Sequence, residues 1–257
     1  MKINSIILMI FIYTKMKIKI DIRSSKLGIL WLLIQPLLYL AIYYISFRYI
    51  LKSKDVASII SCLIGLISYN WFSQVLNEGT VSLIGSKGIT NSTTVPPFIF
   101  IVSSSLVCLW RYIFVLLVFL VFISFYNNQL VFSLNLLLLL PFILLGFLTF
   151  LCITFCLSSL YPIFPDIKHF VDTLVKLFLF VSCVFYEVQS VPLSFTDFFL
   201  FNPLSSLITN LRTIILGHSF YGMSFLLSNI VISVFFLTFG IFLYNLNKKK
   251  FPYINTI

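Results

Sequence analysis

Long apolar stretches separated by short polar segments make up most of this chain of 257 residues. A helix needs about 20 mostly apolar residues to cross the hydrocarbon layer of a membrane. The pattern therefore predicts six transmembrane helices, at residues 29–51, 57–76, 106–126, 134–159, 170–186 and 223–246. The strands of a membrane barrel would instead alternate apolar and polar residues in segments of about ten. The predicted fold is an all-α integral membrane protein with a single membrane domain over residues 1–257.

The segment before the first predicted crossing, residues 1–28, has a different pattern. Between Lys15 and Arg23 charged and apolar residues alternate, and this period of two, taken alone, indicates a strand. Beside a membrane, the preferred interpretation is a helix that lies in the interface and extends its lysines toward the lipid headgroups. We therefore predict an N-terminal amphipathic interfacial helix.

Composition and charge support a membrane protein and orient it. Only 9% of the residues are charged and 60% are hydrophobic, whereas a soluble domain needs many more charges to cover its surface. Lysine and arginine gather in residues 1–28 and again in residues 248–250. Because positive charge marks the cytoplasmic side, both termini are predicted to be cytoplasmic. The net charge of +10 is thus mostly a topology signal, and the pattern leaves no room for a basic soluble domain that would bind nucleic acid.

Few side chains suggest chemistry within the chain. It has no G-x-x-x-x-G-K-[ST] phosphate loop for ATP, and His169 and His218 lack the spacing of metal ligands. No pair of carboxylates falls in the middle of a predicted crossing. Arg111 lies near the cytoplasmic end of the third crossing, where snorkelling to the interface is the favoured interpretation. We predict no catalytic residue and no metal site.

Several landmarks follow one another in order along the chain. The most specific are Leu27-Gly28-x-Leu30-Trp31-x-x-x-Gln35-Pro36 near the start and Asn202-Pro203-Leu204-x(7)-Arg212 near the end, with Asn70-Trp71-Phe72, Gly79, Pro96-Pro97 and Pro165-Asp166 between them. This series resembles the permease subunits of ABC exporters for cell-surface polysaccharides, the O-antigen, capsule and teichoic-acid export family, over residues 15–246. The chain departs from that family's pattern at Pro165, where arginine is frequent, and at Cys183 and Glu187, where proline is usual.

The resemblance implies transport rather than catalysis. A second copy of the chain and two separate ATPase subunits would complete the exporter. The ATPase subunits would bind ATP and Mg²⁺, so the chain itself would need no cofactor. The cargo would be a lipid-linked glycan that moves from the cytoplasm across the bacterial plasma membrane.

The resemblance also implies roles for particular segments. Residues 78–105 would form a cytoplasmic coupling and gate segment, and its candidate residues, together with one in a later loop, are Glu78, Gly79, Pro96, Pro97 and Asp166. Residues 192–221 are too polar and interrupted for a seventh crossing and would form re-entrant helices on the outer side. The landmarks of that segment are Asn202, Pro203 and Arg212.

An aromatic and polar stripe in the first crossing is the candidate lining of the glycan path. Trp31, Gln35, Tyr39 and Tyr43 recur every four residues and extend about 18 Å along one slowly turning helix face. Aromatic rings can stack on the C–H faces of sugars, and polar groups can bond their hydroxyls. The alternative for this stripe is helix packing with aromatic anchoring at the membrane interface.

Two other functions remain open at this point. One is an ABC permease that exports a drug or a lipid, which the aromatic stripe and Gln35-Pro36 disfavour. The other is a membrane-embedded glycosyl- or acyltransferase. Such an enzyme would need a cluster of acids, histidines or metal ligands at the membrane edge, and the sequence shows none.

Overall fold

The computed structural model describes residues 3–23, 30–46, 49, 56–85, 95–127, 134–188, 191–192, 198–199, 201–216 and 222–247. Within these ranges all regular secondary structure is helical, as the sequence predicts. The elements are α1 (Ile3–Arg23), α2 (Leu30–Ile45), α3 (Val56–Gly85), α5 (Phe98–Asn127), the 3₁₀ helix η2 (Leu134–Leu138), α6 (Leu139–Leu160), α7 (Ile167–Val181), α9 (Pro203–Leu216) and α10 (Gly222–Asn247).

Among the described residues, four helices are long and apolar enough to cross a membrane. The candidate spans are Ser58–Gly85, Phe98–Ser124, Leu136–Leu160 and Leu226–Asn247, and they coincide with the second, third, fourth and sixth predicted crossings. Helices also occupy the other two predicted crossings, but α2 has 16 residues and α7 has 15. These lengths correspond to about 24 and 22 Å, against about 30 Å for the hydrocarbon layer.

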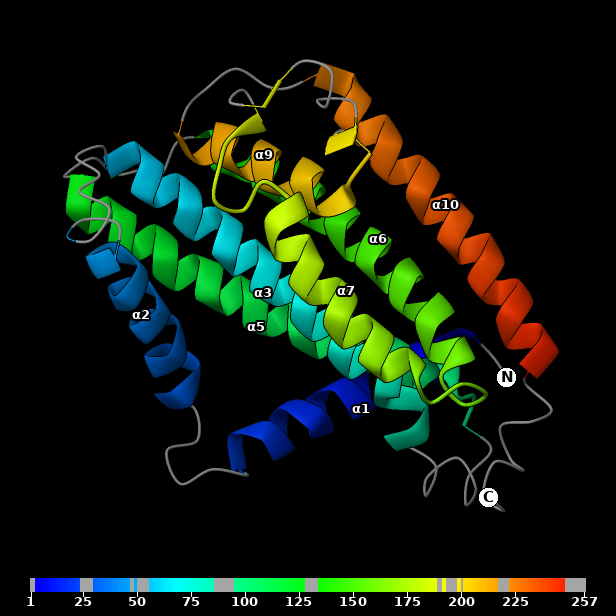
Figure 1. Cartoon of the computed structure of the whole chain (residues 1–257). Coiled ribbons are helices and arrows are strands. Elements are labelled where there is room, and N and C mark those ends of the chain that lie inside the picture. The colour runs from blue at the N-terminus through cyan, green and yellow to red at the C-terminus, as the bar shows by residue number, and fades with distance from the viewer. Residues whose placement is uncertain are drawn as a thin grey trace.

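Helix α3 is the central element of the bundle. It packs against α5, α6, α7 and α9 and also touches α2 (Figure 1). In the most apolar 18-residue stretch of each candidate span, the rest of the chain buries 72% of the stretch in α3 but only 17% of the stretch in α10. Helix α10 rests mainly on α6 and leaves most of its apolar surface uncovered, as suits a helix with lipid as its solvent.

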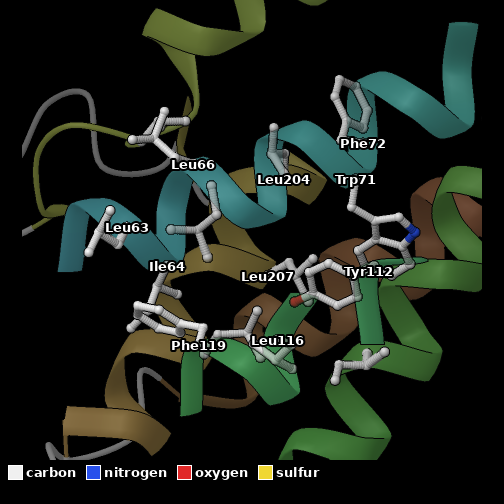
Figure 2. Packing of buried hydrophobic residues seen from close by; sticks show 14 of the residues in the cluster. Leu63, Ile64, Leu66, Trp71, Phe72, Tyr112, Leu116, Phe119, Leu204 and Leu207 are labelled. Carbon is white, nitrogen blue, oxygen red and sulfur yellow. The ribbon is translucent and has the colours of Figure 1, made fainter. Parts of the chain in front are cut away.

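Aromatic packing joins α3 to α5 and α6 in the core. The indole of Trp71 stacks on the ring of Tyr112 with 4.2 Å between centroids (Figure 2). Phe150 packs edge-to-face against both Trp71 and Phe72, at 5.0 Å in each case. Each such pair contributes about 0.5–1.5 kcal/mol beyond the burial of its area. The three helices therefore meet in a fixed arrangement near the middle of α3.

Helix α3 extends beyond the crossing predicted at 57–76. Its 30 residues span about 45 Å and include Glu78 and Gly79, which the resemblance places in a separate coupling segment. Asn77 and Glu78 lower the local hydropathy, but side chains of neighbouring helices satisfy their polar groups. The helix therefore continues to Gly85, well past the end of the apolar run.

The alternating segment between Lys15 and Arg23 is part of helix α1 and forms no strand. The helix also takes in the apolar residues that precede it, starting from Ile3. It lies across the end of the bundle at which α3 ends and α5 begins, and it packs against α5 (Figure 1).

Candidate functional site

A group of four charged side chains joins α1, α3 and α5. This ionic node consists of Lys17 and Asp21 on α1, Glu78 on α3 and Arg111 on α5. The guanidinium of Arg111 donates through Nη1 to Oε1 of Glu78 and through Nη2 to Oδ2 of Asp21, the latter at 2.5 Å. Lys17 Nζ lies 3.2 Å from the second oxygen of Glu78. Two cations thus meet two anions, and the node is formally neutral.

The side chains of the node are partly buried. The side chain of Arg111 is 20% exposed, and those of Glu78, Asp21 and Lys17 are between 31% and 37% exposed. Lys17 Nζ also donates to the hydroxyl of Ser104 on α5, at 2.8 Å. Isolated exposed pairs contribute only about 0.2–1 kcal/mol, but a shared network loses less side-chain entropy for each pair. The contacts therefore hold α1 to the bundle in one register.

Most of this node is not evident from the sequence. Arg111 was expected to snorkel to the interface, whereas the structure places it in contact with two carboxylates. Lys17 and Asp21 were not singled out. The available signal was their opposite charge at a spacing of four residues, which puts both on one face of a helix.

Three successive residues of α3, 77–79, each contact different neighbouring helices. We call these three residues the junction. Asn77 Oδ1 accepts a hydrogen bond from Lys168 Nζ of α7 at 2.9 Å. Glu78 joins the ionic node with α1 and α5. Gly79 packs against α6, where an added Cβ would overlap the Cγ2 methyl of Thr154. A displacement of α3 at the junction therefore acts on four helices.

The other candidate coupling residues lie near the junction's end of the bundle but outside the node. Pro96 and Pro97 directly precede α5, and their carbonyls accept hydrogen bonds from the amides of Ile99 and Phe100, each at 3.1 Å. Asp166 stands at the start of α7 with an exposed side chain that makes no capping hydrogen bond.

The aromatic stripe of α2 is only partly described. Trp31 and Tyr39 are 46% and 43% exposed, so neither packs into the core of this chain. The side chains of Gln35 and Tyr43 lie outside the described residues. Helix α2 stands to one side of the bundle in Figure 1.

Helix α9 is held at its start by the Asn202-Pro203 pair. The side chain of Asn202 accepts from the backbone amides of Leu204 at 3.0 Å and Ser205 at 3.4 Å, which is the bonding of a helix N-cap. Proline is favoured at the next position because its missing N–H has no helical partner there in any case. Asn202 Nδ2 also donates to the hydroxyl of Ser182, at 2.8 Å, and so joins α9 to the segment after α7.

Arg212 of α9 joins the segment after α7 to α3. Its guanidinium donates to three backbone carbonyls, those of Ser61 at 3.0 Å, Tyr186 at 2.8 Å and Val184 at 2.7 Å. Arg212 is 5% exposed. Burial lowers the pKa of its guanidinium from the ordinary value, but arginine stays protonated at any physiological pH. Gly65 makes the approach possible, since a Cβ there would lie 2.5 Å from the Val184 carbonyl oxygen.

Two of the three departures from the family pattern, Cys183 and Glu187, fall in the segment that Arg212 holds. Cys183 has a φ of 53°. Proline, with φ near −65°, could not adopt this left-handed conformation. Glu187 accepts a hydrogen bond from the hydroxyl of Ser61, at 3.3 Å. The replacement at Cys183 therefore matches the local backbone, and the one at Glu187 adds a side-chain contact with α3.

Residues 9–216 match the family model for the ABC-2 type transporter. The chain belongs to this family of transporter membrane subunits. It is a multi-pass membrane protein that transports and does not catalyse, and nucleotide binding resides in an ATPase partner rather than in this subunit.

Curated relatives match over most of the chain. It is 25% identical to an O-antigen export system permease protein RfbA of Klebsiella pneumoniae over 252 residues, which cover 96% of this chain and 94% of the relative. The chain is 23% identical to the O-antigen export system permease protein RfbA of Myxococcus xanthus, and the match covers 91% of this chain and 90% of the relative. The polysialic acid transport protein KpsM of Escherichia coli is 25% identical over 73% of both chains.

Proposed function

We propose that this chain is the membrane permease of an ATP-driven exporter for a cell-surface polysaccharide, either an O-antigen or a capsular glycan carried on a lipid. The observation that carries the proposal is the nearly full-length similarity to an O-antigen export permease, with similarity to a second such permease and to a polysialic acid transporter. The cargo moves from the cytoplasm outward across the plasma membrane.

A deletion experiment tests this function directly. Cells without the chain should lose the surface glycan and accumulate its lipid-linked form inside. Supplying the chain should restore the glycan, and changing the phosphate-loop lysine of the ATPase partner should abolish this rescue. Intact surface glycan combined with altered sensitivity to a drug would instead identify a drug permease.

The directions of the helices support six crossings within one membrane domain. Helices α6 and α10 both end at the end of the bundle at which α3 ends (Figure 1). The chain must return to the other end between them, and α7 is the described helix that runs in that direction. Helix α2 likewise runs opposite to α3. Both short helices therefore take the place of crossings, at residues 29–51 and 170–186.

The placement of α1 supports an interfacial helix and cytoplasmic termini. It lies across the bundle end that also holds Asn247, the last residue of α10 (Figure 1). Its lysines mark this end as cytoplasmic by the positive-inside rule. A reporter fused after Asn247 should be active in the cytoplasm, and one fused after Phe199 should be active outside. A cytoplasmic signal at Phe199 would require a further crossing.

Helix α9 has the properties of a re-entrant element within residues 192–221. Its 14 residues extend about 21 Å, too short to span the hydrocarbon layer. All residues from Pro203 to Ile215 are buried, mainly against α3, α6 and α10. Non-spanning backbone at membrane depth is tolerated where protein covers it and satisfies its polar groups. The Asn202 cap supplies this at the start of α9, and Arg212 does so for the adjoining segment.

The junction is where we place the coupling of ATP binding to transport. Two ATPase subunits would dock at the bundle end formed by α1, by the last turns of α3 and by the first turns of α5 and α7. A push on any of these elements reaches α3 through the junction, because Asn77, Glu78 and Gly79 each contact a different neighbour. Pro96, Pro97 and Asp166 lie at the same end of the bundle and would contribute to the docking surface.

Two copies of the chain would enclose the glycan path. Trp31 and Tyr39 present exposed rings on α2, which makes few contacts with the other helices that the structure describes. Stacking of such rings on sugars suits a sliding polymer, because it requires no fixed pattern of hydroxyls. Gln35 and Tyr43 belong to the same proposed lining on the basis of sequence spacing alone.

A further inference from the structure

An open surface cavity lies against the last two turns of α1. Its volume is about 460 Å³, and the described residues that line it are Met16, Lys19, Ile20 and Arg23. These residues are spaced at i, i+3, i+4 and i+7, so they form one stripe along the helix. Lys17 and Asp21, which hold α1 to the bundle, lie on a different face of the same two turns. A ligand can therefore bind in the cavity while the ion pairs of the node stay formed.

The charges on this stripe are available to a ligand. Among the acidic residues that the structure describes, none forms an ion pair with Lys19 or Arg23. Asp21, the nearest acid in sequence to both, is held by Arg111 on the other face. The described lining thus carries two positive charges and no negative charge, which favours an anion.

The apolar half of the lining restricts what that anion can be. Met16 is 52% exposed and Ile20 is 61% exposed, so the two cations flank uncovered apolar surface. An inorganic anion would leave this surface in water, whereas an amphiphile covers it with its chain. Lysine and arginine are both strong phosphate binders, and arginine can engage a phosphate through two parallel hydrogen bonds.

We infer that this cavity binds the phosphate end of a membrane lipid, with Lys19 and Arg23 on the phosphate and Met16 and Ile20 on the first part of the lipid chain. The inference rests on the interfacial placement of α1 under the proposed function. The phosphate can belong to a phospholipid of the bilayer or to the lipid carrier of an exported glycan, since both present the same chemistry.

Native mass spectrometry of the purified full-length chain tests the site. The protein is held in a maltoside detergent, which contains no phosphate, and is titrated separately with polyprenyl monophosphate, phosphatidylglycerol and the neutral alcohol polyprenol. We expect saturable binding of one lipid where a phosphate is present and no saturable binding of polyprenol. Changing both Lys19→Gln and Arg23→Gln should weaken this binding about 30-fold, since each cation near a lipid phosphate contributes about one kcal/mol.

The matched control removes two charges elsewhere. Lys15→Gln with Lys176→Gln gives the same net charge, and neither residue lines the cavity. This control should bind as the wild type does, and Arg23→Lys should keep most of the affinity. Preferential binding of polyprenyl phosphate assigns the site to a lipid carrier, and equal binding of phosphatidylglycerol assigns it to the bilayer.

Two results would overturn the inference. One is unchanged phosphate-lipid binding in the Lys19→Gln, Arg23→Gln variant, and the other is an equal loss in the charge-matched control. Both are independent of glycan export, which is measured in cells. Failure of the proposed polysaccharide function therefore leaves this binding result interpretable.

Discussion

At the residue scale, the junction combines two kinds of constraint. Glu78 is held by charge, between Arg111 and Lys17. Gly79 is held by shape, because its missing side chain lets α3 approach Thr154 of α6. One contact depends on electrostatics and the other on close packing, so separate substitutions can test them.

The shape constraint predicts a rescue. Gly79→Ala should destabilise the protein by about 1–3 kcal/mol, the usual cost of overpacking a close contact. The clash falls on the Cγ2 methyl of Thr154, so adding Thr154→Ser should recover most of the loss. Thermal unfolding of the detergent-purified chain measures both effects. Gly85→Ala is the matched control, because no atom of the described residues lies within 4 Å of a Cβ there, and it should not destabilise.

The charge constraint predicts measurable coupling between Glu78 and Arg111. In a double-mutant cycle of Glu78→Gln and Arg111→Gln, the coupling free energy should be about 0.5–1 kcal/mol, because the side chains are partly exposed to solvent. Asp166→Asn makes the same carboxylate-to-amide change at an exposed site and should leave stability unchanged. Strictly additive effects of the two node substitutions would refute the ion pair.

At the element scale, apolar runs locate the helices but not all of their ends. The four long helices could be predicted because about 20 apolar residues have few other solutions in lipid. The extension of α3 to Gly85 could not, because the partners of its polar residues are distant in sequence. Lys168 is 91 residues from Asn77, and Arg111 is 33 residues from Glu78.

Helix α9 illustrates the same limit. Its polar composition correctly indicated that it is no ordinary crossing, and its landmarks Asn202, Pro203 and Arg212 could be identified in the sequence. What those landmarks do could not be predicted. The carbonyls that Arg212 binds belong to Ser61, 151 residues away, and to an irregular segment whose path no periodicity describes.

Removing the Arg212 contacts should release the segment that follows α7. Arg212→Gln leaves three carbonyls, two of them buried, without their charged donor, at a cost of about 2–4 kcal/mol. Arg212→Lys keeps the charge but lacks the planar fork and should rescue only slightly. Limited proteolysis should show faster cleavage near Tyr186 in both variants. Arg23→Lys, on the surface of α1, is a control that should leave this cleavage rate unchanged.

At the scale of the whole molecule, the ionic node ties the interfacial helix to the transmembrane bundle. Helix α1 contacts α5 along its length and reaches α3 through Lys17 and Glu78. The family and the general transport function could be predicted from ordered landmarks in the sequence. The complete ionic node could not be predicted, because it depends on the angle at which α1 crosses α5. The local sequence pattern does not determine that angle.

Under the proposed function, the junction couples ATP hydrolysis to glycan movement. The most direct test is the amount of glycan exported per ATP hydrolysed, measured in membrane vesicles that contain the chain with its ATPase partner. Glu78→Gln with Arg111→Gln should keep ATP hydrolysis and complex assembly while lowering this ratio about tenfold. A ratio equal to that of the wild type in the node variant would contradict the account.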